Sequence, residues 1–247
     1  MPTPSGTIGE VKDIVREHFS RTQFPTGQLD LALTEGRRII EHHGNFWWMR
    51  TRKDFALVID QGTYNILVST NNGLNIPNFK DAIAFTWTTD GGTVFEQIPL
   101  GVIEREEAET IYADGENGTP ELVIIDNETL YVYPEDPQDE YDCRLYYWTY
   151  TDNPDLNSET DVLTLRFPMA LAYAAIAWGY EMVVKDFQAA SYFRNLLGGQ
   201  PFGRGGQLAV LKRENFKRQW QDQVTLTPRL GSNTRFKHRM DNVQIYR

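Results

Sequence analysis

GTPELVIIDNETLYVYP, residues 118–134, contains two short β-rich runs on either side of an Asp-Asn pair. Residues 121–126 and 128–133 are rich in β-branched and aromatic side chains, and Asp126-Asn127 is a turn signal between them, so the segment predicts a β-hairpin. Residues 143–150 form a third run of the same kind and predict the strand that closes the module. The middle of the chain is therefore predicted to be antiparallel β structure.

The same composition begins well before the hairpin. Runs at 55–59, 64–68 and 82–88 are separated by turn-rich segments and predict three further strands. Residues 104–111, which contain four glutamates, predict a short acidic helix or turn. We therefore expect a β domain over residues 52–151.

Helical patterns precede this β domain. Thr7 is followed three residues later by Glu10, the spacing of a capping box, and apolar residues then recur with helical period, which predicts a helix over residues 8–19. Residues 26–43 predict a second helix with its leucines and isoleucines on the inward side.

Helical patterns also follow the β domain, after a linker predicted at 154–164. Pro168 suits the first turn of a helix over 169–184 that is apolar almost all round, which predicts burial between other helices. Residues 185–197 are expected to continue this helix past a break near Asp186.

A last helix is predicted over residues 207–224. Phe216, Trp220 and Val224 recur at fourfold spacing among polar side chains and predict a narrow stripe that packs on one neighbour. The two helical blocks each have an apolar face that needs a partner. The predicted fold class is therefore α+β: a discontinuous helical bundle domain, residues 1–50 and 167–225, with an inserted antiparallel β domain.

Charge separates the C-terminal end from the rest of the chain. The 247 residues carry a net charge of −10, which argues against the broad basic surface of proteins that grip nucleic acid backbone. Residues 226–247 carry five basic residues against one acidic residue and form a basic C-terminal arm. Its scattered apolar side chains favour folding on a partner protein over idle disorder.

Cysteine content and hydropathy predict the compartment. A single cysteine permits no disulfide within the chain, and the sequence contains no apolar run long enough to cross a membrane. We expect a protein that is made in a cytosol-like compartment and has no membrane partner.

No catalytic residue, metal ligand or cofactor is predicted. The glycine-rich run 198–206 lacks the Gly-Lys-Ser/Thr ending and the strand context of a phosphate loop, so it is interpreted as a loop or hinge. His42 and His43 are adjacent and point about 100° apart on a helix, which does not suit one metal ion. Cys143 lies in a strand pattern without a nearby histidine and is interpreted as a small buried hydrophobe.

Carboxylates and aromatics each leave two interpretations open. The acidic runs 104–109 and 135–140 are either solvated faces and turns or a negative surface that lines a passage for DNA. Trp47, Trp48 and Trp220 are predicted to be anchors of the core or of an interface between subunits, because aromatic side chains dominate both.

The order of these features resembles the head-to-tail adaptor, or connector, proteins of tailed bacteriophages. The resemblance covers residues 8–200 and rests on layout: a helix that leads to Phe46-Trp47-Trp48, a strand near Tyr64, Gly118-Thr119-Pro120 before a hairpin, Tyr131 to Pro134 with Pro137 and Tyr141 after it, and Phe167-Pro168 before an alanine-rich helix with Asp186 near its end.

The resemblance implies a structural virion protein without enzymatic activity. Such proteins form a ring, usually of twelve copies, at the virion neck between the portal and the tail or nozzle proteins, and double-stranded DNA passes through the lumen without specific binding. Assembly is expected in the host cytoplasm. The C-terminal segment is implied to reach the portal, which makes these arm residues the expected portal contacts: Arg229, Arg235, Phe236, Lys237, Arg239, Ile245 and Tyr246.

A different class of function stays open at this point. The aromatic and acidic β region also suits a tail-associated carbohydrate-binding or hydrolytic module. Dependence of assembly on the portal would distinguish the two classes.

Overall fold

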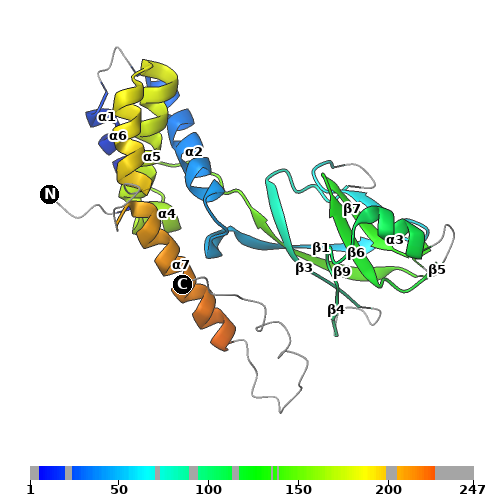
Figure 1. Ribbon diagram of the computed structural model, residues 1–247. Coiled ribbons are helices and arrows are strands. Elements are labelled where there is room, and N and C mark those ends of the chain that lie inside the picture. The colour runs from blue at the N-terminus through cyan, green and yellow to red at the C-terminus, as the bar shows by residue number, and fades with distance from the viewer. Residues whose placement is uncertain are drawn as a thin grey trace.

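The computed structural model describes residues 6–19, 24–69, 73–88, 94–112, 117–134, 136–137, 139–198 and 205–225, without the side chains of Thr26, Asp136 and residues 219–225. Figure 1 shows all the helices except α3 gathered at one end of the molecule and the strands, with α3, at the other. We call these two parts the helical lobe and the β lobe. The fold class is α+β, as predicted.

Six helices make up the helical lobe: α1 (Ile8–Glu17), α2 (Thr26–His42), α4 (Val162–Arg166), α5 (Pro168–Gly179), α6 (Phe187–Gly198) and α7 (Gln207–Thr225). The predicted cap of α1 is confirmed, because the Thr7 side chain accepts a hydrogen bond from the backbone N–H of Glu10 at 3.3 Å. The Glu10 carboxylate in turn accepts from the backbone N–H of Gly6 at 3.0 Å.

Helix α5 is the centre of the helical lobe, and its predicted burial is confirmed. It packs against α1, α2 and α6, and its many alanines allow close approach. At Gly36 of α2, a Cβ atom would lie 2.7 Å from the backbone nitrogen of Ala175, so only glycine fits this helix crossing without displacement.

The helix predicted over residues 185–197, after a break near Asp186, is confirmed as α6 (Phe187–Gly198). The break is at the predicted place, but the chain leaves α5 through a wide helical turn, Tyr180–Val184, and Lys185 is left-handed with φ 63°. Helix α6 then packs alongside α5, and the rings of Tyr180 and Phe193 stack 5.8 Å apart. A left-handed residue ends the helix and allows the chain to turn back.

The β lobe contains two main sheets. One has the order β1-β9-β3-β4, formed by β1 (Arg50–Leu57), β9 (Tyr141–Thr149), β3 (Phe79–Thr88) and β4 (Glu96–Ile98). The other has the order β2-β7-β6, formed by β2 (Thr63–Asn65), β7 (Thr129–Tyr133) and β6 (Leu122–Asp126), and β5 (Asn117–Gly118) pairs with β8 (Asp136–Pro137). The predicted hairpin is confirmed as β6–β7, and Asn127 in its turn has φ 50°.

The strand predicted over residues 143–150 as the last of the module is confirmed as β9, and it lies inside its sheet. Strand β9 pairs with β1 on one side and with β3 on the other, so it is internal. Its alternating pattern places Cys143, Leu145 and Tyr147 in the core between the two sheets.

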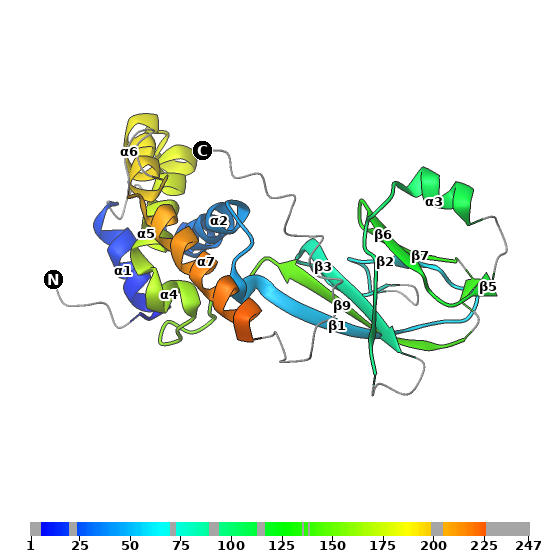
Figure 2. The same cartoon turned by 60° about the horizontal axis from the view of Figure 1, so that its bottom comes forward.

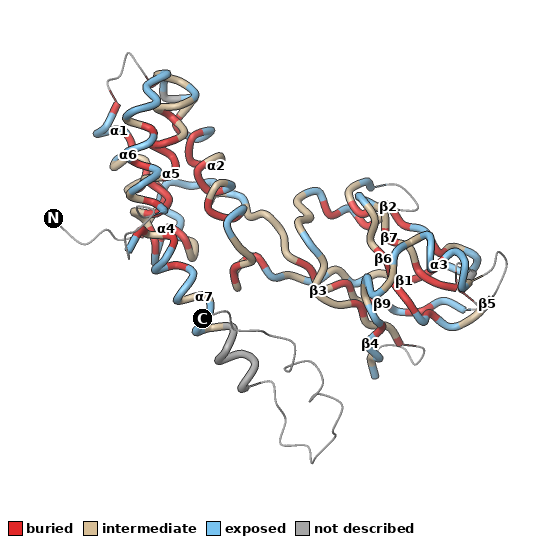
Figure 3. The backbone as a smooth tube through the Cα atoms, viewed as in Figure 1, coloured by how far each residue is buried: buried red, intermediate tan, exposed pale blue. Residues whose placement is uncertain are grey.

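A third layer covers the second sheet. Helix α3 (Arg105–Ile111) is the predicted short acidic helix, and its Ala108 packs on Leu122, Ile124 and Tyr133. Figure 2 shows α3 on one side of the β lobe and the β1-β9-β3 sheet on the other. Figure 3 shows buried stretches within each lobe, in agreement with separate cores in the helices and between the sheets.

The segment predicted as a linker at 154–164 is instead fixed to the helices. Its last residues form α4, and the backbone carbonyls of Asn157 and Glu159 accept hydrogen bonds from Gly9 at 2.9 Å and Ile8 at 3.0 Å. These two N–H groups belong to the first turn of α1, where backbone N–H groups have no carbonyl acceptors within their own helix. The segment therefore supplies the missing acceptors.

The narrow stripe predicted to pack on one neighbour of α7 is not buried at Phe216. This side chain is 67% exposed, and the residues of α7 that enter the core are Leu208 and Leu211. The side chains of Trp220 and Val224 lie outside the described residues. Within the described part of the chain, no helix is both long and apolar enough to span a membrane.

Candidate functional site

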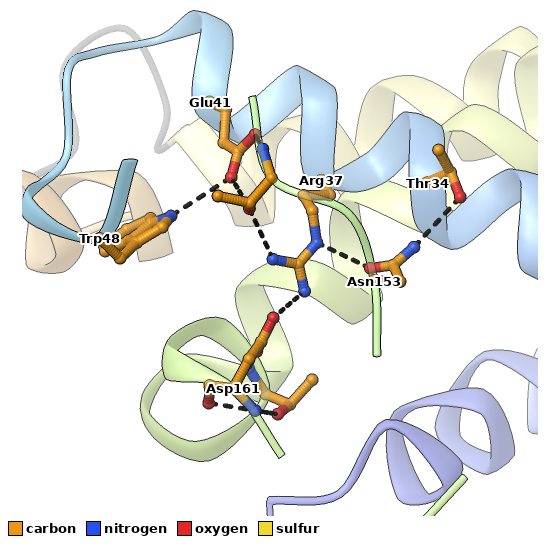
Figure 4. Close-up of polar contacts among 8 residues, drawn as sticks. Thr34, Arg37, Glu41, Trp48, Asn153 and Asp161 are labelled. Carbon is orange, nitrogen blue, oxygen red and sulfur yellow. Dashed lines mark hydrogen bonds and ion pairs between the residues drawn. The ribbon is translucent and has the colours of Figure 1, made fainter. Parts of the chain in front are cut away.

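The candidate site is the junction between the two lobes, where the chain leaves α2 for β1 and returns from β9. Two charged residues near the end of α2 lie at i and i+4, so both face the returning chain. Arg37 is 2% exposed and Glu41 is fully buried. Figure 4 shows that each is bound to residues outside its own helix.

Arg37 holds the segment that leaves β9. Its Nε donates to Oδ1 of Asn153 at 2.7 Å, one terminal nitrogen donates to Oγ1 of Thr151 at 2.9 Å, and the other forms an ion pair with Asp161. The planar guanidinium suits three acceptors on one side chain. Asn153 also donates to Oγ1 of Thr34 at 3.1 Å, so the segment is tied to α2 twice.

Glu41 binds both segments that connect the lobes, the one from α2 to β1 and the one that leaves β9. Its carboxylate accepts hydrogen bonds from the backbone N–H of Thr151 at 3.0 Å and from the Thr151 hydroxyl. It also accepts from Nε1 of Trp48 at 3.2 Å. A buried carboxylate is tolerated only when its oxygens are hydrogen-bonded, and here the donors come from the outgoing and the returning chain.

Lys80 connects the sheet to the end of α2. This side chain of β3 donates to the carbonyl oxygen of Gly44 at 2.7 Å and to that of Glu41. Carbonyls at a helix C-terminus have no partners within the helix, and a cation there is favourable. Burial lowers the pKa of Lys80, and the nearby carboxylates of Glu41 and Asp81 act in the opposite direction.

The aromatic residues after α2 link the junction to α7. The rings of Phe46 and Trp48 stack with centroids 4.6 Å apart, and Trp47 meets Trp48 edge to face at the same distance. The guanidinium of Arg218 lies over the Trp47 ring at 4.5 Å, and Asn215 accepts from the backbone N–H of Trp47 at 3.0 Å. Both tryptophans are half-buried.

The arrangement suits positioning of the two lobes. The buried charges of the junction are used in hydrogen bonds between segments that lie far apart in the sequence. Both chain crossings are bound at several points, so the junction fixes the start of β1 and the end of β9 against the helical lobe.

Of the other residues singled out in the sequence, Cys143 lies away from this cluster, whereas His42 and His43 lie at its border. Cys143 is buried in the β lobe, and burial raises the pKa of its thiol. His42 contacts the hydroxyl of Tyr150 at 3.1 Å, whereas burial and the charge of Lys212 lower the pKa of His43. In the part of the chain that the structure describes, no three His, Cys, Asp or Glu side chains are grouped as metal ligands would be.

The expected portal contacts of the arm, residues 226–247, lie outside the described residues, as does the side chain of Trp220. Arg37, Glu41 and Asp161 were not singled out from the sequence. A signal was present, because Arg37 follows Leu29 and Leu33 at fourfold spacing and so continues the inward row of α2. A charge in such a row indicates a buried partner.

Comparison with known families identifies the chain. A search of curated proteins found no match. The family model of the SU10 adaptor protein matches residues 7–225, a range that includes all the described elements of both lobes and the junction between them. The chain therefore belongs to the SU10 adaptor protein family and is a structural phage adaptor.

Proposed function

We propose that this protein forms a ring at the virion neck that joins the portal to the tail and leaves a channel for DNA. The observation that carries the proposal is the family match, which extends over residues 7–225 and so includes both lobes. A ring of twelve copies, with tail or nozzle proteins on its other side, is the arrangement that the resemblance to head-to-tail connectors implies.

The structure supports a connecting role through its junction. An adaptor between two assemblies must keep its two ends in a fixed relation, and buried hydrogen bonds from Arg37 and Glu41 provide this between the lobes. The acidic character of the chain also suits a channel, since a net charge of −10 disfavours adhesion of the DNA duplex.

The basic arm, residues 226–247, is the proposed portal-binding segment. Arg229, Arg235, Lys237 and Arg239 would face acidic portal surface, and Phe236, Ile245 and Tyr246 would enter pockets. A segment that orders on binding needs buried side chains as well as charge to hold it. Trp47, Trp48 and Trp220 remain the proposed anchors of the core or of the contact between subunits.

Deletion of residues 226–247 tests the portal contact. The chain with and without the arm is mixed with purified portal, and the complexes are examined by mass photometry and by electron microscopy of the ring. We expect the full chain to add as a ring and the shortened chain to lose portal binding while its melting temperature is unchanged.

Two results would count against the proposal. A full chain that binds the portal at isolated positions would contradict the ring. A shortened chain that binds with unchanged affinity and salt dependence would assign the arm another role, with contact to DNA as the leading alternative.

A further inference from the structure

The two lobes differ strongly in charge. Residues 50–150, which contain the β lobe, hold nineteen acidic and six basic residues, a net of −13. The whole chain is −10, so the remaining residues carry +3. Residues 226–247 carry +4 of this charge, so the helical lobe itself, residues 1–49 and 151–225, is nearly neutral at −1. One copy therefore joins a strongly acidic lobe to a nearly neutral one, and a basic face on the helical lobe depends on where its charges lie.

Three of the eight exposed basic residues in the described helical lobe lie on α7, more than on any other of its elements. Val210, Arg213 and Lys217 lie at i, i+3 and i+7, which puts them in one row on the helix surface, and all three are exposed. Lys212 is also exposed, but it lies on a different side of α7, near His43. Since Leu208 and Leu211 face the core, this row is the outer face of α7.

The one carboxylate in the described middle of α7 is already engaged. Glu214 forms ion pairs with Arg166 of α4 at 2.5 Å and with Arg218 at 3.5 Å. It therefore does not neutralise Lys212, Arg213 or Lys217. The outer face of α7 combines exposed cations with the exposed apolar side chain of Val210, which is 46% accessible.

Helix α3 presents the opposite combination at the far side of the β lobe. Glu104, Glu106 and Glu107 are exposed, whereas Glu109 is paired with Arg105 at 2.6 Å. Exposed apolar residues lie at both ends of this helix, with Val102 69% and Ile111 57% accessible. Its inner side is fixed on the sheet through Ala108.

We propose that the outer face of α7 in one copy docks on α3 of the next copy in the ring. The occupant is a second copy because the same chain carries both surfaces, on different lobes and with opposite charge. Exposed apolar residues on each helix would be covered in the contact, and the flanking charges would set its orientation. This inference rests on the proposed ring and names the contact that would close it.

Charge reversal on each face tests the contact with full-length chains. Arg213→Glu with Lys217→Glu makes α7 acidic, and Glu106→Lys with Glu107→Lys makes α3 basic. Assembly of each variant, alone and on purified portal, is measured by mass photometry over a range of concentrations. We expect each variant to need a roughly tenfold higher concentration for half-maximal assembly, because like charges then meet across the interface.

Mixing distinguishes this contact from a general effect of charge. In a 1:1 mixture the acidic α7 of one variant meets the basic α3 of the other. The native basic α7 of the second variant likewise meets the native acidic α3 of the first. Rings in which the two variants alternate should therefore form as readily as wild-type rings. A single chain with all four substitutions should recover in the same way. The variant Arg16→Glu with Arg38→Glu, which reverses two exposed arginines on α1 and α2, should assemble normally.

Several outcomes would overturn the proposal. Unchanged assembly of the separate variants, no recovery on mixing, or an equal loss in the Arg16 and Arg38 control would each exclude this contact while the ring itself stands.

If reversal on α7 spares assembly but abolishes retention of duplex DNA, the face binds nucleic acid. If α3 unfolds on reversal, Glu106→Gln with Glu107→Gln should still weaken assembly. A wild-type chain that stays monomeric alone and on the portal would refute the proposed ring as well.

Discussion

Arg37 of α2 forms an ion pair with Asp161, which lies 124 residues further along the chain. Asp161 is also the N-cap residue of α4. The Asp161 carboxylate also accepts from the backbone N–H of Thr164 at 2.8 Å. One carboxylate thus starts a helix and neutralises a buried guanidinium, which couples the packing of α2 to the return of the chain from the β lobe.

Replacement of Arg37 should destabilise the protein strongly. In Arg37→Ala the Asp161 carboxylate loses its counter-charge, and Asn153 and Thr151 lose their donors. Because Asp161 is partly accessible, we expect a loss of about 3 kcal/mol in the free energy of unfolding, measured by urea denaturation.

Arg38→Ala is the matched control. Arg38 is half exposed and pairs with the partly exposed Glu35 at 3.4 Å, so its loss should change the stability by less than about 0.5 kcal/mol. Equal effects of the two substitutions would contradict the role given to Arg37.

Two glycines of α2 should respond in opposite directions to alanine. Gly36→Ala would push a methyl group into the backbone of Ala175 and should cost about 1–3 kcal/mol. A methyl group at Gly27 would meet no other atom within 4 Å, so Gly27→Ala should stabilise the helix by up to about 1 kcal/mol. Thermal melts of the two variants should fall on opposite sides of the wild type.

Trp48→Phe should reveal the strength of the bond to Glu41. The substitution keeps an aromatic ring on Phe46 but removes the Nε1 donor from a buried carboxylate, and we expect a loss of about 2 kcal/mol. Trp47→Phe keeps the ring under Arg218 and should cost about 1 kcal/mol or less. A larger effect at Trp47, measured by denaturant unfolding, would exclude the carboxylate as the main partner of this aromatic pair.

The buried thiol of Cys143 should give stability a measurable pH dependence. Its pKa is raised in the folded state by burial, whereas an unfolded thiol titrates near its ordinary value of 9.0. Above about pH 9 the thiol of the unfolded state loses its proton, whereas the buried thiol of the folded state keeps it. The free energy of unfolding is therefore unaffected by this group below about pH 9 and decreases as the pH rises above it. Urea unfolding between pH 7 and 10 should show a larger decrease in the wild type than in Cys143→Ala, where the tyrosines with raised pKa values still contribute. A thiol reagent at pH 8 should label only denatured protein.

The β lobe should fold as a separate domain. Its two hydrophobic clusters draw only on residues between Phe55 and Tyr147, so residues 50–151 contain their complete core. We expect this fragment to unfold cooperatively in urea. Unfolding without a cooperative transition would show that the β lobe depends on the helical lobe, and the predicted division at 52–151 would then be wrong.

Local signals in the sequence predicted the elements well. The Thr7 cap, the start of α5 at Pro168 and the β6–β7 hairpin each depend on residues within a few positions of one another. Capping, turn formation and periodicity act over that range, so the sequence alone is enough to recognise them.

The sequence did not determine how an element is placed against a distant one. Strand β9 is internal because β3 pairs with its second edge, and α6 returns along α5 because Lys185 is left-handed. Phe216 is exposed because Leu208 and Leu211 hold the other side of α7 against the core. In each case the local pattern was compatible with both arrangements.

The sequence by itself determined the α+β class, most elements and the acidic body with its basic arm, because composition and short-range pattern specify these properties. Only the tertiary structure decided that Arg37 binds Asp161, that Glu41 joins Trp48 to Thr151, and that α3 and α7 expose opposite charges on different lobes. These relations join residues that lie far apart in the chain. Their physical cause is the packing of whole elements, which no local window contains.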